Sequence, residues 1–215
     1  MKTIALENAV AMIPNGASVM IGGFMGVGTP ERLMDELTRQ GKRDLTIIAN
    51  DTSAPGNGIG KLITAKAVRK AIVSHIGLNP ETQQKMIAGE IEVDLVPQGT
   101  LIERIRAAGY GLGGILTPTG VGTLADEGKR KIEVDGKLYL LETALRADFA
   151  LVEAFLSDYF GNLVYALTSR NFNPVIAMAA TTIIVDAAHI VPVGMISPDH
   201  VVTPAVLVDY VIAHE

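Results

Sequence analysis

Short apolar runs rich in β-branched residues alternate with amphipathic segments in the first half of the chain, and this alternation constrains the fold most strongly. Runs typical of buried strands occupy residues 17–21, 44–49, 71–75 and 93–96. Segments with helical spacing occupy residues 30–40, 59–70, 80–89 and 98–107. Such an alternation implies parallel strands joined by crossover helices on both faces of the sheet. The sequence therefore predicts an α/β fold with a mainly parallel central sheet and flanking helices.

The segment 30–40 shows the clearest helix signals. Its apolar residues, among them Leu33 and Leu37, fall on one face. We expect Thr29 to be the N-cap, Pro30 to be the first helical residue, and Gly41 to end the helix.

The second half of the chain is richer in strand signals than in helix signals. Residues 131–134 and 137–141 are separated by Asp135-Gly136, which is typical of a two-residue β-hairpin. Further short apolar runs lie at 148–152, 163–165, 182–185 and 206–209. We therefore expect antiparallel hairpin elements beside the parallel sheet. With no polar linker or internal repeat, we expect residues 1–215 to form a single domain.

Charge and cysteine content exclude several classes of partner. The chain has 18 basic and 23 acidic residues, a net charge of −5, which argues against binding to nucleic acid or to an anionic membrane surface. It has no cysteine, so disulfides, thiolate metal sites and cysteine nucleophiles are excluded.

Glu7 and Asn8 interrupt the N-terminal apolar pattern before a secretory signal could form, and we expect a cytoplasmic protein.

Two further features have structural interpretations. Residues 107–125 carry no charge over a length that could cross a bilayer, but their many glycines and Pro118 disfavour a helix, so we expect a loop with a short strand at 114–116. Three acidic side chains are interpreted as a solvated helix end rather than an acid/base pair: Glu81, Glu90 and Glu92. The histidines show no metal-ligand spacing, and we expect no metal site: His75, His189, His200 and His214.

The glycine-rich loop after the first buried strand is the best candidate for a binding site. Residues 22–28 contain four glycines and lead into the predicted helix at 30–40. Unshielded backbone N–H groups and the positive end of a helix suit a diphosphate, although the same glycines could simply make a tight turn. The loop lacks the Gly-Lys-Ser/Thr ending of a nucleotide P-loop. A dinucleotide fingerprint starting at Gly26 would need a third glycine where Glu31 stands. Asp51 lies where a ribose-binding acid could sit, so an NAD-dependent dehydrogenase remains an alternative.

Residues 15–30, with Asn15-Gly16, an apolar strand, Gly22-Gly23-Phe24 and Gly28-Thr29-Pro30, resemble the first signature of the family I CoA-transferases. Similar pieces follow in order over nearly the whole length, at residues 48–51, 74–81, 96–101, 117–123, 146–152 and 169–173. Within this family, which includes the 3-oxoacid CoA-transferases acting on acetate, butyrate and acetoacetate, the chain resembles the alpha (A) subunits.

The resemblance implies an enzyme that moves CoA between a short-chain acyl-CoA and acetoacetate or a similar carboxylic acid. In this family a glutamate attacks the thioester and forms a glutamyl-CoA thioester, and that glutamate stands in a Ser-Glu-Asn-Gly motif. No glutamate of this chain lies in such a motif. The resemblance therefore implies a partner beta subunit that carries the nucleophile, in a hetero-oligomer such as α2β2. CoA would be a co-substrate, and no permanently bound cofactor is expected.

The resemblance also assigns site residues. It implies a CoA-binding loop made of Gly22, Gly23, Phe24, Met25, Gly26, Val27 and Gly28. Gln98 resembles a glutamine near the thioester whose amide could stabilise an oxyanion, and the alternative is a structural helix-start residue. Asn50 and Asp51 end the second strand, where α/β sheets bind ligands, and either could face substrate. Arg170 could face a substrate carboxylate or brace a loop or subunit contact. A non-catalytic ligand-sensing domain of the same fold remains an alternative function.

Overall fold

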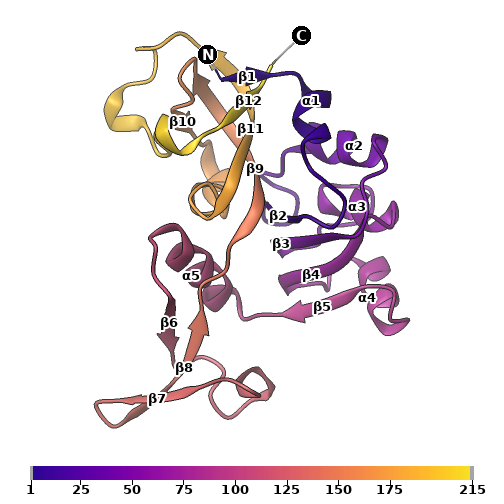
Figure 1. Ribbon diagram of the computed structural model, residues 1–215, viewed down its shortest axis with the longest axis vertical. Helices are drawn as coiled ribbons and strands as arrows, with labels where there is room; N and C mark the ends of the chain where they lie inside the picture. Colours follow the sequence, from indigo (N-terminus) through magenta and orange to yellow (C-terminus); the bar gives the residue numbers. More distant parts are fainter. Residues whose placement is uncertain (1, 214–215) are drawn as a thin grey trace.

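The computed structural model of the protein describes residues 2–213 and shows an α/β arrangement around one large sheet (Figure 1). The strands in the first part of the chain are β1 (Thr3–Ile4), β2 (Ser18–Ile21), β3 (Leu45–Asp51), β4 (Val68–His75) and β5 (Glu92–Leu95). The helices between and after them are α1 (Leu6–Ala11), α2 (Glu31–Arg39), α3 (Ile59–Thr64), α4 (Pro80–Ile87) and α5 (Gln98–Gly109).

The second part of the chain is mostly strand. It contains β6 (Gly114–Thr117), β7 (Lys131–Val134), β8 (Lys137–Thr143), β9 (Ala147–Asp158), β10 (Leu163–Val164), β11 (Ala180–Val191) and β12 (Tyr210–Ile212). Between them lie α6 (Asn173–Ile176) and the short 3-10 helices η1 (Leu124–Asp126), η2 (Leu167–Arg170), η3 (Pro198–His200) and η4 (Ala205–Leu207).

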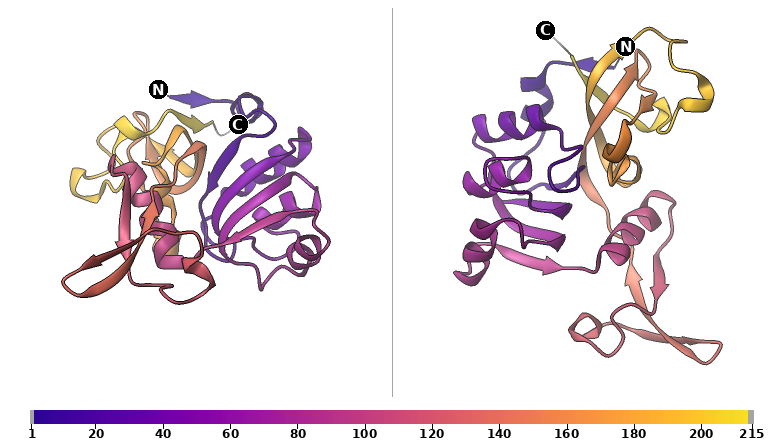
Figure 2. Two further views of the ribbon diagram at one scale, coloured as in Figure 1. Left: turned by 60° about the horizontal axis from the view of Figure 1, so that its bottom comes forward. Right: turned by 180° about the vertical axis from the view of Figure 1, so that it is seen from behind.

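The large sheet has the strand order β1-β12-β11-β9-β2-β3-β4-β5, and every pair along this path is parallel. β10 adds to β9 in the antiparallel direction. A second, antiparallel sheet of order β6-β8-β7 projects from the body as an arm (Figures 1 and 2). Its hairpin turns at Asp135 and Gly136, both at positive φ, as the predicted two-residue turn requires. The predicted mainly parallel sheet with antiparallel hairpin elements is thus confirmed.

The two faces of the large sheet bury separate apolar cores. Ile47 and Ala49 of β3 pack with α1, α2 and α3 on one face, and the intervening Ile48 packs with α5 and α6 on the other. Because successive side chains of a strand point to opposite faces, a strand buried on both sides must be apolar throughout. The near-continuous apolar runs in the sequence have this cause.

Three sequence predictions about element boundaries are wrong. Residues 59–70 were expected to be one helix, but α3 ends at Thr64, Lys66 adopts φ 56°, and β4 begins at Val68. Val68 pairs with Leu45 of β3, so strand pairing overrides the helical spacing.

The other two errors concern local caps and the last predicted strand. Pro30, not Thr29, is the N-cap of α2, and no side chain caps that helix. Residues 206–209 do not form a strand: Ala205–Leu207 is a 3-10 turn with Val206 largely exposed, and the final strand is β12. Asp209 instead accepts a hydrogen bond from the Ile183 N–H of β11.

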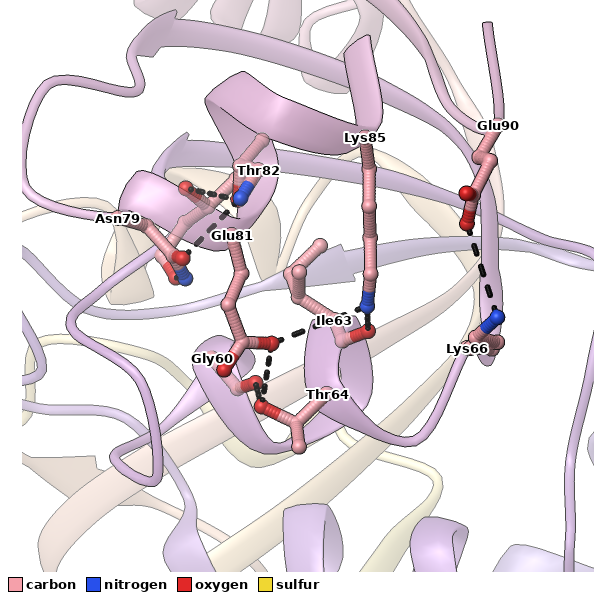
Figure 3. Close-up of polar contacts among 10 residues, drawn as sticks. Gly60, Ile63, Thr64, Lys66, Asn79, Glu81, Thr82, Lys85 and Glu90 are labelled. Atoms are coloured by element: carbon pink, nitrogen blue, oxygen red, sulfur yellow. Dashed lines mark hydrogen bonds and ion pairs between the residues drawn. The ribbon is translucent and has the colours of Figure 1, made fainter. Parts of the chain in front are cut away.

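Polar contacts join α3 and α4 on the outside of the sheet (Figure 3). Glu81 accepts a hydrogen bond from the Thr64 hydroxyl at 2.9 Å and lies 3.8 Å from Lys85 Nζ, and Lys85 donates to the Ile63 carbonyl. Glu90 pairs with Lys66. Such ion pairs contribute little to stability individually. They give Glu81, in the first turn of α4, and Glu90, beyond its last turn, a structural use, in line with their interpretation as surface groups.

Candidate functional site

The glycine-rich loop lies where the strand order of the large sheet changes direction. From β2 the chain builds outward through β3, β4 and β5, and then returns to place β9 on the other side of β2. Open α/β sheets bind ligands beyond the carboxyl ends of their strands at such a point. Residues 22–28 leave the carboxyl end of β2 at this position. The chain topology therefore puts the predicted loop at the expected place for a ligand.

The loop forms a miniature hairpin of its own. Phe24 and Val27 exchange two backbone hydrogen bonds of 3.0 Å, and Met25 and Gly26 between them adopt φ 53° and 87°. These dihedrals fit a type I′ turn. Phe24, Met25 and Val27 consequently present their side chains outward, with exposed fractions of 40%, 51% and 53%.

Five of the seven loop N–H groups expected to cradle a phosphate form hydrogen bonds inside the protein. Gly22 N–H donates to the Leu151 carbonyl, Gly23 N–H to the Asn171 side chain, and Met25 N–H to Asp51. The Phe24 and Val27 N–H groups bond to each other's carbonyls in the hairpin. The start of α2 carries the acidic side chain of Glu31. The geometry thus offers ligand the apolar side chains of the loop rather than a row of open N–H groups.

The glycines of the loop permit close packing against the segment after η2. A Cβ atom on Gly22 would lie 1.8 Å from Asn173 Oδ1. On Gly28, which adopts φ +80°, it would lie 2.9 Å from Ser169 Cα. Both distances are far inside van der Waals contact, so glycine is required at these positions. The tight-turn interpretation therefore accounts for them without a phosphate.

Asn171 and Asn173 clamp the loop, and sequence reasoning missed this role. Asn171 Nδ2 donates to the carbonyls of Val27 and Thr168, both at 2.9 Å. The fully buried Asn173 donates to the Gly28 and Ser169 carbonyls and accepts from the Glu153 N–H. Two asparagines spaced by one residue in a short loop are the only sequence signal, because side-chain clamping of a distant loop leaves no periodic pattern.

Gln98, Asn50 and Asp51 come together in one hydrogen-bonded chain. Gln98 Nε2 donates to Asn50 Oδ1 at 2.7 Å, and Asn50 Nδ2 donates to Asp51 Oδ2 at 2.7 Å. The same Asp51 oxygen accepts the Met25 N–H at 2.8 Å. The chain thus links the first residue of α5, the end of β3 and the glycine-rich loop.

Within this chain, Gln98 is the exposed member. Asn50 and Asp51 are buried, with exposed fractions of 2% and 4%. Asp51 Oδ1 accepts the Ser53 N–H at 2.7 Å, so both of its oxygens already have donors. A carboxylate engaged in this way is poorly placed to bind a ribose, which weakens the dehydrogenase alternative. Of these three residues, the Gln98 side chain is the one that projects into the open.

Two cavities flank Arg170 at this edge of the sheet. One, of about 570 Å³, is lined by Phe24, Met25, Val27, Thr168, Arg170 and Asn171. The other, of about 520 Å³, is lined by Leu156, Val164, Arg170, Met195, Ile196, Ser197, Asp199, His200 and Val202. The loop therefore supplies an apolar wall to a cavity whose lining contains a single charged side chain, that of Arg170.

A pair of acidic residues lies deeper in the sheet. Glu153 of β9 and Asp186 of β11 are directly paired in the parallel register, and both line a cavity of about 240 Å³. Burial raises the pKa of Glu153, and the charge of Asp186 adds to this, whereas a hydrogen bond with Ser169 opposes it. Asp186 also pairs with Arg32 at 3.3 Å. The predicted strands at 148–152 and 182–185 each end one residue before these acids, because the acids interrupt the apolar runs.

The described residues contain no group of three or more histidine, aspartate or glutamate side chains placed to hold a metal ion. His214 lies outside the described residues. Along residues 2–213, no helix combines the length and the apolar character needed to cross a membrane.

Comparison with known proteins identifies the family. A model of the family described as coenzyme A transferase matches residues 3–214. The chain is 53% identical over 214 residues to the acetate CoA-transferase subunit alpha of Escherichia coli K12, covering 100% of this chain and 97% of the relative. It is 49% identical to the acetoacetyl-CoA:acetate/butyrate CoA transferase alpha subunit of Clostridium acetobutylicum, covering 98% of this chain and 97% of the relative.

Among solved structures, an acyl-CoA transferase of Escherichia coli O157:H7 has the same fold, with a TM-score of 0.85 at 24% identity. The match covers 99% of this chain and 46% of that longer one, so this chain spans about half of its length. The relatives favour a transferase over the ligand-sensing and dehydrogenase alternatives. The chain therefore belongs to the coenzyme A transferase family.

Proposed function

We propose that this chain is the alpha half of an enzyme that moves CoA between a short-chain acyl-CoA and acetoacetate or a similar carboxylic acid. The observation that carries the proposal is the hydrogen-bonded chain from Gln98 through Asn50 and Asp51 to the loop, at the topological switch point of a coenzyme A transferase fold. The names of its near-full-length relatives support an alpha subunit with a beta partner. An α2β2 assembly, a cytoplasmic location and CoA as co-substrate are parts of the proposal.

The reaction needs a nucleophilic glutamate. This chain lacks the Ser-Glu-Asn-Gly motif in which the family carries that glutamate. A glutamate of the partner attacks the acyl-CoA carbonyl, and the tetrahedral intermediate expels CoA as a thiolate, which leaves an acyl-glutamyl anhydride. The thiolate then attacks the glutamyl carbonyl, which releases the first carboxylate and leaves a glutamyl-CoA thioester. The second carboxylic acid repeats these steps in reverse and departs as its own CoA thioester.

Gln98 is suited to stabilise the negative oxygen that develops in each attack. Its amide has two N–H bonds, and one of them is held by Asn50 Oδ1, which fixes the orientation of the other. Asn50 is in turn oriented by Asp51. A fixed donor aimed at the developing charge costs no reorganisation during the reaction. We therefore assign Gln98 as the donor and Asn50 and Asp51 as positioning residues.

The loop of residues 22–28 would contact CoA through its side chains. Phe24, Met25 and Val27 are exposed beside the larger cavity and could pack against the apolar parts of the pantetheine arm or of the acyl group. The four glycines and the clamping asparagines hold these side chains in place.

The proposal is tested by producing the chain alone and together with a partner that carries the Ser-Glu-Asn-Gly motif. We expect transfer of CoA from acetoacetyl-CoA to acetate only by the assembled enzyme. Intact-mass spectrometry after incubation with acyl-CoA should find the CoA adduct on the partner. A partner whose motif glutamate is replaced by glutamine is the control and should form no adduct. Transfer by the isolated chain, or an adduct on it, would contradict the proposal.

A further inference from the structure

Arg170 ends the short helix η2 and contributes to the walls of both surface cavities at the switch point. Its side chain is exposed, and within residues 2–213 its guanidinium forms no hydrogen bond or ion pair. An arginine carries five N–H donors in a planar fork that matches carboxylate and phosphate groups. Here those donors face open cavities.

The backbone that carries Arg170 is held firmly. The Ser169 N–H and hydroxyl both donate to the Ala166 carbonyl, and the buried Asn173 donates to the Ser169 carbonyl. Asn171 links the Thr168 carbonyl to the Val27 carbonyl of the loop. The clamp therefore fixes the backbone of Arg170 relative to the loop. Within residues 2–213, no acceptor pairs with its guanidinium group.

The surroundings on the loop side favour an anion. The cavity of about 570 Å³ contains no charged lining residue besides Arg170, and its wall includes Phe24, Met25 and Val27. These apolar side chains can pack against the apolar part of a ligand while Arg170 binds its charged group. On the other side, Asp199 lines the cavity of about 520 Å³ and would repel an anion. An anionic group is therefore better accommodated between Arg170 and the loop.

We propose that Arg170 is the anion-binding residue of a ligand site whose apolar wall is formed by Phe24, Met25 and Val27. The ligand it fits is a molecule with an apolar chain and a carboxylate or phosphate oxyanion. This inference rests on the proposed function, in which the free acid carries a carboxylate and acyl-CoA carries phosphates. It names the group through which the alpha half would hold one of these substrates.

The test uses the enzyme assembled with its partner and three variants of this chain: Arg170→Gln, Arg170→Lys and, as a matched control, Arg43→Gln. Arg43 is also exposed but precedes the amino end of β3, at the opposite edge of the sheet. KM and kcat are measured for an acyl-CoA, for the corresponding acyl-pantetheine, which lacks the phosphates, and for the free acid.

If Arg170 holds a phosphate, Arg170→Gln should raise KM for acyl-CoA about tenfold and leave KM for acyl-pantetheine unchanged. If it holds the carboxylate, KM for the free acid should rise by a similar factor instead. In both cases kcat should change little, and Arg170→Lys should retain part of the affinity because the charge remains. Arg43→Gln should behave as the unsubstituted enzyme.

Unchanged KM values for all three substrates in Arg170→Gln would overturn the inference while leaving the proposed function intact. So would equal effects in Arg170→Gln and Arg43→Gln. If the unsubstituted assembly shows no transfer, the proposed function fails, and calorimetry with CoA and with butyrate still decides the role of Arg170. Equal affinities of the unsubstituted protein and Arg170→Gln, or binding by neither, would then exclude the site.

Discussion

At the residue scale, Gln98 combines exposure with a fixed orientation. Its amide donates a hydrogen bond to the buried Asn50, and the amide of Asn50 donates one to Asp51. A surface glutamine with only a structural role would have no need of a buried partner that is itself oriented by a carboxylate. The arrangement resembles the support that enzymes give to a donor whose direction matters.

We predict that Gln98→Ala lowers kcat of the assembled enzyme by about 100-fold, the usual effect of losing one oxyanion donor. The melting temperature should change little, because Gln98 is exposed. Gln98→Glu keeps the size of the side chain but loses the donor, and should be similarly impaired. The rate of CoA transfer from acetoacetyl-CoA to acetate and the thermal unfolding curve are measured on the same samples.

Gln84→Ala is the matched control, since Gln84 is an exposed glutamine on α4. It should leave both kcat and melting temperature unchanged. If Gln98→Ala loses stability and activity in proportion, Gln98 is a structural helix-start residue and the assignment of the donor is wrong.

At the scale of elements, the sequence predicts the regular parts of the fold better than its junctions. Apolar periodicity locates β2, β3, β4, β5 and the hairpin of β7 and β8, because each of these depends on residues close in sequence. The end of α3 depends on the pairing of Val68 with β3. The turn at residues 205–207 is followed by Asp209, which accepts a hydrogen bond from β11, and both partners lie far away in the chain. The spacing of apolar residues along the sequence does not show which distant segments pair.

The sequence likewise predicts some features of the candidate site and not others. The position of the loop after a buried strand, and of Asn50 and Asp51 at a strand end, follows from the sequence pattern. The use of the loop N–H groups does not, because their acceptors come from β9, from Asp51 and from Asn171. A glycine-rich loop therefore indicates close backbone packing, but the group that it packs against is set by the tertiary structure.

This packing leads to a prediction for Gly22→Ala. The added methyl group would displace the Asn173 amide, which makes three hydrogen bonds to Glu153, Gly28 and Ser169 in a fully buried position. At about 1 kcal/mol per lost bond, we expect the free energy of unfolding in urea to fall by about 3 kcal/mol. Gly22 does not adopt a positive φ, so the effect is steric.

Gly113→Ala is the control, since a Cβ there meets nothing within 4 Å. It should change the free energy of unfolding by well under 1 kcal/mol. The double variant Gly22→Ala/Asn173→Ala should lose less than the sum of the two single variants, because both remove the same clamp. Additive losses would show that the glycine is needed for another reason.

At the scale of the whole molecule, the central strands serve both cores and the site at once. β2 and β9 form the boundary between the two halves of the sheet. The loop leaves the carboxyl end of β2, and Glu153 lies midway along β9. The hydrogen-bonded chain from Gln98, the clamp of Asn173 and the acidic pair of Glu153 and Asp186 all meet around this boundary. A change in the charge of a group at this boundary should therefore change the free energy of unfolding of the whole protein.

Glu153 provides the test. Burial raises the pKa of Glu153 above its ordinary value of 4.5 in the folded state, with Asp186 adding to the effect. Below the ordinary pKa the carboxyl is protonated in both states, so its full contribution to stability is present. As the pH rises through the folded-state pKa, the unfolded chain ionises more readily, and that contribution is lost. The wild-type protein should thus lose stability from this group on the alkaline side of pH 4.5.

We predict that Glu153→Gln removes this loss. The difference in free energy of unfolding between Glu153→Gln and the unsubstituted protein should become more favourable to the variant as the pH is raised from 4 to 8. Urea unfolding at a series of pH values measures it. Comparing the two proteins cancels the opposite contributions of groups with lowered pKa, such as Asp158, whose hydrogen bonds from Asn162, Phe160 and Gly161 outweigh its burial. Glu127→Gln, at an exposed position, is the control for the substitution itself. A constant difference for Glu153→Gln would mean that Glu153 ionises in the folded protein as it does in the unfolded chain.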